Sequence, residues 1–188
     1  MRFDVDEARA CASRLLAGSD DRLAHAKAAV RRADEIASVV GPSDRELLLC
    51  GAWLHDVGYG EKIRTVGFHP LDGALALEKL GWPSRLCALV AHHSESRITA
   101  SALGLSDQLD RFPREEGAVT DALVHADLAA GPRGERMSLL ERLDDIERRH
   151  LDDPLALCRA RTARRPALIQ AITRTEQRLH SLRCRVSG

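Results

Sequence analysis

The sequence predicts an all-α fold. Its apolar residues are mostly Ala and Leu, and aromatic residues make up only 3% of the chain, a composition that favours helix over sheet. Apolar residues recur at spacings of three and four, and glycines and prolines divide the chain into segments of helical length. No segment shows the strict alternation of apolar and polar residues that is typical of a strand. With 188 residues, the chain can bury a core without a disulfide or a structural metal.

The first part of the chain is predicted to form three helices, over residues 5–17, 19–40 and 43–56. Gly18 and Gly41 end the first two, because glycine favours the position that follows a helix. Ser43 and Glu46 have the spacing of a capping box at the start of the third helix. The continuation over residues 47–54 is apolar on all faces, so we expect this helix to lie buried at the centre of the fold.

The rest of the chain is predicted to form five further helices, over residues 70–81, 83–93, 114–130, 138–150 and from 166 onward. Pro70, Pro83 and Pro166 each suit the first turn of a helix, where an N–H group is not needed. Residues 57–68 and 94–113 are expected to be loops.

The distribution of charge divides the chain into two parts. The whole chain has 28 basic and 28 acidic residues, which excludes a protein that coats nucleic acid. Residues 155–188 contain eight Arg and one Glu, whereas residues 1–154 contain 20 basic and 27 acidic residues. An apolar stripe that includes Leu168 and Leu179 indicates that the basic segment docks as a helix. We therefore predict a helical domain over residues 1–154 and a basic helical extension, residues 155–188, docked on it.

Cysteine usage and the N-terminal sequence bear on the compartment. The five cysteines are scattered and include no C-x-x-C pair, which argues against a disulfide framework and favours a reducing compartment. The first residues, MRFDVDEARA, lack the apolar segment of a secretory signal. No segment reaches the about 18 apolar residues of a membrane span. We expect a cytoplasmic protein with no membrane partner.

Imidazole and carboxylate groups gather at helix ends and on apolar helix faces. His55 and Asp56 follow a buried apolar helix, where both are costly to bury unless a metal or a hydrogen-bond network satisfies them. Five helices together supply the candidate ligands: His25, His55, Asp56, His69, His92 and Asp127. Imidazole and carboxylate ligands suit Fe, Mn, Co, Ni or Zn. The sequence therefore predicts a metal site between the helices.

The order of four of these residues resembles the HD-domain superfamily of metal-dependent phosphohydrolases: His25, His55, Asp56 and Asp127. The resemblance covers roughly residues 20–130, and it implies a helical bundle with a metal site between the central helices. His69 and His92 lie between the His-Asp pair and the last Asp, as in the dinuclear branches of the superfamily. The resemblance thus implies two divalent ions, with Asp56 bridging them and with His69 and His92 holding the second.

The activity that the resemblance implies is hydrolysis of a small phosphoester by a hydroxide that bridges the metals. A nucleotide is the favoured substrate. Asp56 then acts in catalysis as the bridging ligand. Phosphoryl oxygens need positive charge, which we expect from Lys62 and Arg133, because each closely follows a ligand segment. His93 would point about 100° away from its neighbour on a helix, and we expect it to face the substrate or to support a ligand.

Two other functions are compatible with the residues. Some HD-fold proteins are non-haem di-iron oxygenases that cleave C–C or C–P bonds with O₂, and their ligand order fits this chain equally well. Tyr59, near the His-Asp pair, does not decide between the two activities. A non-enzymatic binding module would have a degraded ligand set, whereas all six positions are present here. The expected partner is a small phosphorylated molecule; we do not expect nucleic acid, and a homo-oligomer is left open.

Overall fold

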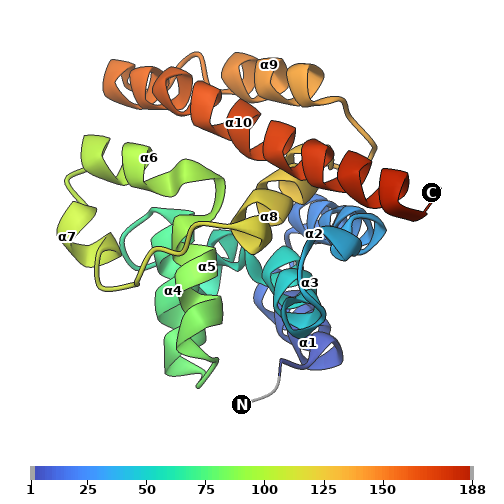
Figure 1. Cartoon of the computed structure of the whole chain (residues 1–188). Helices are drawn as coiled ribbons and strands as arrows, with labels where there is room; N and C mark the ends of the chain where they lie inside the picture. Colours follow the sequence, from blue (N-terminus) through green and yellow to red (C-terminus); the bar gives the residue numbers. More distant parts are fainter. Residues whose placement is uncertain (1–2, 187–188) are drawn as a thin grey trace.

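A computed structural model describes residues 3–186. Its α-helices are α1 Val5–Leu15, α2 Asp20–Glu35, α3 Arg45–Leu54, α4 His69–Lys79, α5 Ser84–His92, α6 Ser96–Ala102, α7 Ser106–Leu109, α8 Ala118–Leu128, α9 Leu139–Arg149 and α10 Leu155–Val186. Within these residues there is no β-strand, and extended pairing is limited to one isolated bridge between Ala130 and Arg136. The predicted all-α fold is confirmed (Figure 1).

Helix α3 lies at the centre of the larger part of the molecule. Its residues 47–54 are all buried, because an apolar surface on every face leaves no side that favours water. Helices α1, α2, α5 and α8 pack against it. Helix α8 also contacts α10, so it connects the α1–α5 side of the molecule with α9 and α10 on the other side (Figure 1). The predicted central position of this helix is confirmed.

Helix capping differs between α9 and α3. Ser138 caps α9, and its reciprocal hydrogen bonds with Glu141 form a complete capping box. At the start of α3, Pro42–Asp44 instead form a short 3₁₀ helix, η2, and α3 begins at Arg45 without a side-chain cap from Asp44. The prediction at Ser43 was wrong because Pro42 sets the backbone of a tight turn that includes Ser43.

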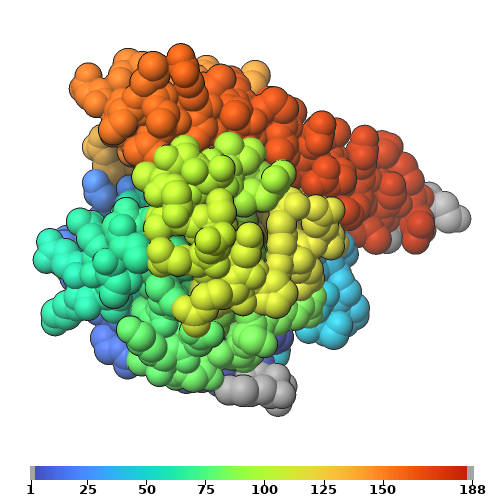
Figure 2. Space-filling model, turned by 90° about the vertical axis from the view of Figure 1, so that its left-hand side faces the viewer, coloured from blue at the N-terminus to red at the C-terminus, as the bar shows by residue number. Residues whose placement is uncertain are grey.

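Residues 94–113 were expected to form a loop but contain α6 and α7. Helix α5 ends, the chain turns at Ser94 and Glu95, which have φ of 51° and 55°, and it then becomes helical again. Helix α6 packs on α10, beneath its N-terminal half in Figure 2. Tertiary packing therefore stabilises a helix whose serine-rich and threonine-containing sequence has weak intrinsic propensity.

Helix α10 begins at Leu155 and continues through Pro166, so the prediction that Pro166 begins the last helix was wrong. Proline inside a helix costs about 3 kcal/mol. Burial offsets this cost, because apolar residues from Leu168 onward pack against α8 and α9. Arg174 and Arg178 also donate hydrogen bonds to the buried carboxylate of Asp121 on α8.

The C-terminal end of α10 projects beyond the rest of the molecule (Figure 2). Within residues 3–186, no helix combines the length and the apolar character needed to cross a membrane.

Candidate metal centre

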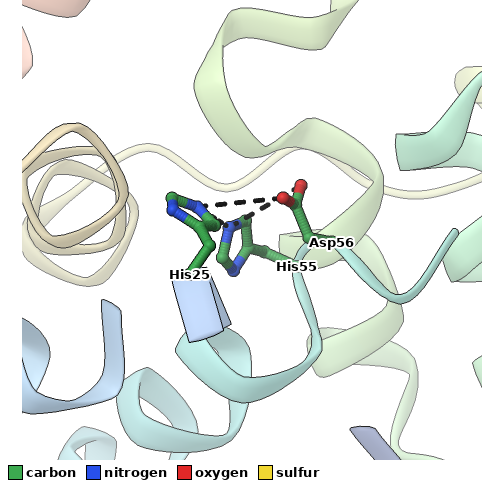
Figure 3. A group of neighbouring side chains, drawn as sticks. All are labelled: His25, His55 and Asp56. Carbon is green, nitrogen blue, oxygen red and sulfur yellow. Dashed lines mark hydrogen bonds and ion pairs between the residues drawn. The ribbon is translucent and has the colours of Figure 1, made fainter. Parts of the chain in front are cut away.

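Four of the predicted ligands meet where α2, α3 and α8 come together. His25 lies in α2, Asp127 lies near the end of α8, and His55 and Asp56 directly follow α3. Nε2 of His25 lies 3.2 Å from Nε2 of His55, 3.8 Å from Oδ2 of Asp56 and 3.1 Å from Oδ1 of Asp127. His25 and His55 are only 1% and 0% exposed. Figure 3 shows three of these side chains pointing toward one another.

A second group of ligands lies on the other side of Asp56. Oδ1 of Asp56 is 3.5 Å from Nε2 of His69, the first residue of α4, and 3.8 Å from Nε2 of His93. The two Nε2 atoms are 3.2 Å apart. One carboxylate therefore contacts both groups: Oδ2 lies toward His25, and Oδ1 lies 3.7 Å from Nε2 of His55 as well as close to His69 and His93.

The histidines are oriented by hydrogen bonds from their other ring nitrogen. The Nδ1–H groups donate to backbone carbonyls: His25 to Gly131 at 3.1 Å, His55 to Ala52 at 3.0 Å and His93 to Val90 at 2.6 Å. This tautomer leaves each Nε2 with its lone pair directed into the site. Two lone pairs that face each other at 3.2 Å repel unless a cation lies between them. The donor set thus fits metal ions, whose histidine ligands are commonly fixed in this way.

The charges around the site hold the two carboxylates in the form that binds metal. Burial opposes the charge of Asp56, but the neighbouring imidazoles, His55 first, hold its pKa below the ordinary value. Burial likewise opposes the charge of Asp127, yet its contacts with His25 and His55 keep its pKa well below the usual range. Both carboxylates are therefore anionic at neutral pH, and carboxylate anions are the form that coordinates metal.

Burial also opposes the charged form of the imidazoles in the second group, and for a base this lowers the pKa. It lowers the pKa of His69 well below the ordinary value and also lowers the pKa of His93. Both rings are therefore neutral at neutral pH, as ligation requires.

The structure corrects the prediction for His92. Nε2–H of His92 donates to the carbonyl of Phe112 at 2.7 Å, away from the other candidates. The angle expected between two adjacent helical residues does not apply, because α5 ends at His92, whose φ of −102° and ψ of 6° depart from helical values. His93, expected to face the substrate or support a ligand, thus occupies the ligand position expected for His92, beside His69 and Asp56.

The two cationic residues that were predicted to bind phosphoryl oxygens, Lys62 and Arg133, also lie away from the ligand cluster. Lys62 is exposed in the outer 3₁₀ turn η4, Glu61–Ile63, and Arg133 is exposed in the tight turn that follows α8. Neither lines the cavity beside the ligands. Both predictions used distance along the chain, which does not determine the direction in which a loop side chain points.

A cavity of about 390 Å³ adjoins the ligand cluster, and Asp56, His69, His93 and Asp127 lie in its wall. Six arginines also line it: Arg22, Arg64, Arg142, Arg149, Arg161 and Arg164. Among these, Arg22 was not predicted from the sequence, although a signal for it exists. Arg22 precedes His25 by three residues and so shares its helix face. The arginines of α9 and α10 have no such signal, because in the sequence they resemble the solvated charges of a surface helix.

Arg22 and Tyr59 support the second group of ligands. Nη1 of Arg22 donates to Oδ2 of Asp56 at 3.2 Å, and the guanidinium lies 3.7 Å from the centre of the Tyr59 ring. The Tyr59 ring in turn stacks on His69, with 4.1 Å between the ring centres. Tyr59 belongs to η3, Val57–Tyr59, the turn that follows Asp56. The turn therefore holds His69 in place from one side.

Comparison with known proteins agrees with this geometry. A sequence model of the HD domain matches residues 22–146, more than half of the chain and the part that contains every ligand of the cluster. No curated protein and no solved structure matches the chain. The matched residues and the clustered ligands give the same conclusion: the chain belongs to the HD-domain superfamily of metal-dependent phosphohydrolases.

Proposed function

We propose that this protein uses two divalent metal ions to hydrolyse a small phosphoester, and that a nucleotide is the favoured substrate. The observation that carries the proposal is the position of Asp56, whose carboxylate belongs to both groups of candidate ligands, His25 with His55 and His69 with His93. Metal ions bound there supply a nucleophile at neutral pH and positive charge for the phosphoryl oxygens. Imidazole and carboxylate donors suit Fe, Mn, Co, Ni or Zn.

The protein's own residues position the ligands and surround the substrate. Arg22 holds Asp56 by a hydrogen bond, and backbone carbonyls fix three of the imidazoles. The cavity of about 390 Å³ falls in the range of small-molecule sites, and its arginines match the charge of a phosphorylated ligand. The five free thiols are consistent with a reducing compartment such as the cytoplasm.

The test is phosphate release from a panel of nucleotides and sugar phosphates by metal-loaded protein, in air and under nitrogen. We expect phosphate release that does not depend on oxygen and that is lost in Asp56→Ala. Unchanged activity of Asp56→Ala would refute the assignment of the site.

The same donor set also suits two iron ions, so a di-iron oxygenase is the second candidate. It predicts oxygen consumption, a mixed-valence iron signal and no phosphatase activity. That combination of results would replace the hydrolase proposal.

A further inference from the structure

Helix α10 brings Arg164 into the wall of the cavity that contains the ligand cluster. The match to the HD domain ends at residue 146, so Arg164 lies outside the part of the chain that matches the family. Its guanidinium donates through Nη1 to the carbonyl of Ser94 at 3.2 Å. The Ser94 hydroxyl donates to Oδ2 of Asp127 at 2.5 Å. Arg164 is therefore one residue removed from a candidate metal ligand.

The turn that receives Arg164 has a strained backbone. Ser94 and Glu95 both have left-handed φ values, 51° and 55°, a conformation that is unfavourable for residues other than glycine. Such strain persists where the surrounding contacts over-determine it. Here the turn places three groups at once: the His93 ring, the Ser94 hydroxyl and the carbonyl that accepts from Arg164.

Arg164 is partly buried and, unlike most of its neighbours, has no counterion. Four other arginines of the cavity are paired: Arg22 with Asp56, Arg142 and Arg149 with Asp145, and Arg161 with Asp153. Among the residues that the structure describes, no carboxylate lies within ion-pair distance of Arg164. Burial lowers the pKa of its guanidinium, because an isolated charge is poorly solvated there. An anion in the cavity would relieve this cost.

We propose that Arg164 binds an oxygen of the phosphoryl group in the substrate, and that α10 is therefore part of the active site. The inference rests on the proposed phosphohydrolase function. The guanidinium presents several N–H donors in one plane, the arrangement that suits phosphate oxygens, and only Nη1 is engaged by Ser94.

The substrate class follows from the balance of charge. Six arginines and four aspartates line the cavity, and two metal ions would add further positive charge. A terminal phosphate has two negative charges and three non-bridging oxygens, whereas a phosphodiester has one charge and two such oxygens. A cationic donor beyond the metal ions therefore favours a phosphomonoester.

The test compares metal-loaded Arg164→Gln and Arg164→Lys with the wild-type chain. Arg165→Gln is the matched control, because Arg165 is the next residue of α10 and pairs with Asp144 and Glu147 at the surface. The measurements are kcat and KM for p-nitrophenyl phosphate and for bis(p-nitrophenyl) phosphate, the calorimetric affinity for inorganic phosphate, the metal content and the melting temperature.

We expect Arg164→Gln to lower kcat/KM for the monoester about 100-fold and to weaken phosphate binding, with a smaller effect on the diester. Metal content and melting temperature should be unchanged, Arg164→Lys should retain part of the function, and Arg165→Gln should behave as wild type. Equal loss for both esters, or wild-type kinetics in Arg164→Gln, would overturn the inference.

The phosphate measurement separates this inference from the proposed function. If the wild-type chain hydrolyses neither these esters nor any member of the nucleotide and sugar-phosphate panel, the proposed function fails, but phosphate binding still tests Arg164. Phosphate binding that is absent in the wild type, or equally tight in Arg164→Gln, would overturn the assignment of Arg164.

Discussion

Asp56 is the residue on which the arrangement of the site depends. It directly follows the buried helix α3, and its carboxylate lies within reach of both groups of histidines. Its position is determined by a local signal, an apolar helix that ends in His-Asp. The Nδ1–H bonds of the histidines to backbone carbonyls then determine which ring nitrogen faces Asp56. At the level of single residues, the site consists of imidazole nitrogens and carboxylate oxygens whose lone pairs are directed toward positions that cations can occupy.

The two adjacent histidines after α5 should have separable roles. We expect His93→Ala to lose the metal of the second group, because its Nε2 lies beside His69 and Asp56. His92→Ala should retain both metals and lose stability instead, since it removes a hydrogen bond to Phe112, worth about 1 kcal/mol. Metal content and urea unfolding of both variants check this. Loss of metal from His92→Ala alone would contradict it.

The buried thiols should react differently from the exposed one. Burial raises the pKa of Cys50 to about 12 and that of Cys87 to about 11, and only a thiolate is nucleophilic. Iodoacetamide at pH 8.5, followed by mass spectrometry, should modify the exposed Cys184 and leave Cys50 and Cys87 intact until urea is added. Modification of all three at similar rates in native buffer would contradict this.

The same shifts have a consequence for stability. A thiol ionises near pH 8.5 in the unfolded chain, whereas Cys50 and Cys87 keep their protons to higher pH in the folded protein. The unfolded state thus binds fewer protons above pH 8.5. The free energy of unfolding should therefore fall as the pH rises from about 8.5 toward 11.

At the scale of elements, the close approach of η3 and α4 positions His69. A Cβ added to Gly58 would overlap the carbonyl oxygen of His69, so only glycine allows the two elements to lie at this distance. Asp72 in α4 accepts hydrogen bonds from the backbone of Val66 and Gly67 and ties the loop before α4 to the same helix. The position of His69 therefore depends on contacts between elements.

We expect Gly58→Ala to destabilise the protein by about 1–3 kcal/mol and to weaken metal binding, because α4 must move away from η3. Gly41→Ala is the control: its φ is −62°, and the nearest atom to an added Cβ is Oγ of Ser43 at 3.8 Å. Urea unfolding and metal content measure both effects. Equal stability of the two variants would contradict the role given to Gly58.

Across the whole molecule, the features that could be predicted from the sequence are those that depend on local sequence patterns. The position of α3 followed from its apolar faces. Helix ends and apolar helix faces predicted a metal site between helices, and the resemblance to the HD-domain superfamily assigned His25, His55, Asp56 and Asp127 to it. Features that depend on tertiary contacts could not be predicted in the same way. Examples are the turn that directs His93 inward and the continuation of α10 through Pro166. The direction of Arg164 likewise depends on the packing of α10 against α6.

Metal content per chain tests the central claim most directly. The measurement is inductively coupled plasma mass spectrometry of wild type, Asp56→Ala and the surface control Asp144→Ala, after metal loading and desalting. We predict two divalent ions per chain in the wild type and in Asp144→Ala, and fewer than one in Asp56→Ala. A wild-type chain without stoichiometric metal, or an Asp56→Ala chain with the full complement, would contradict the account.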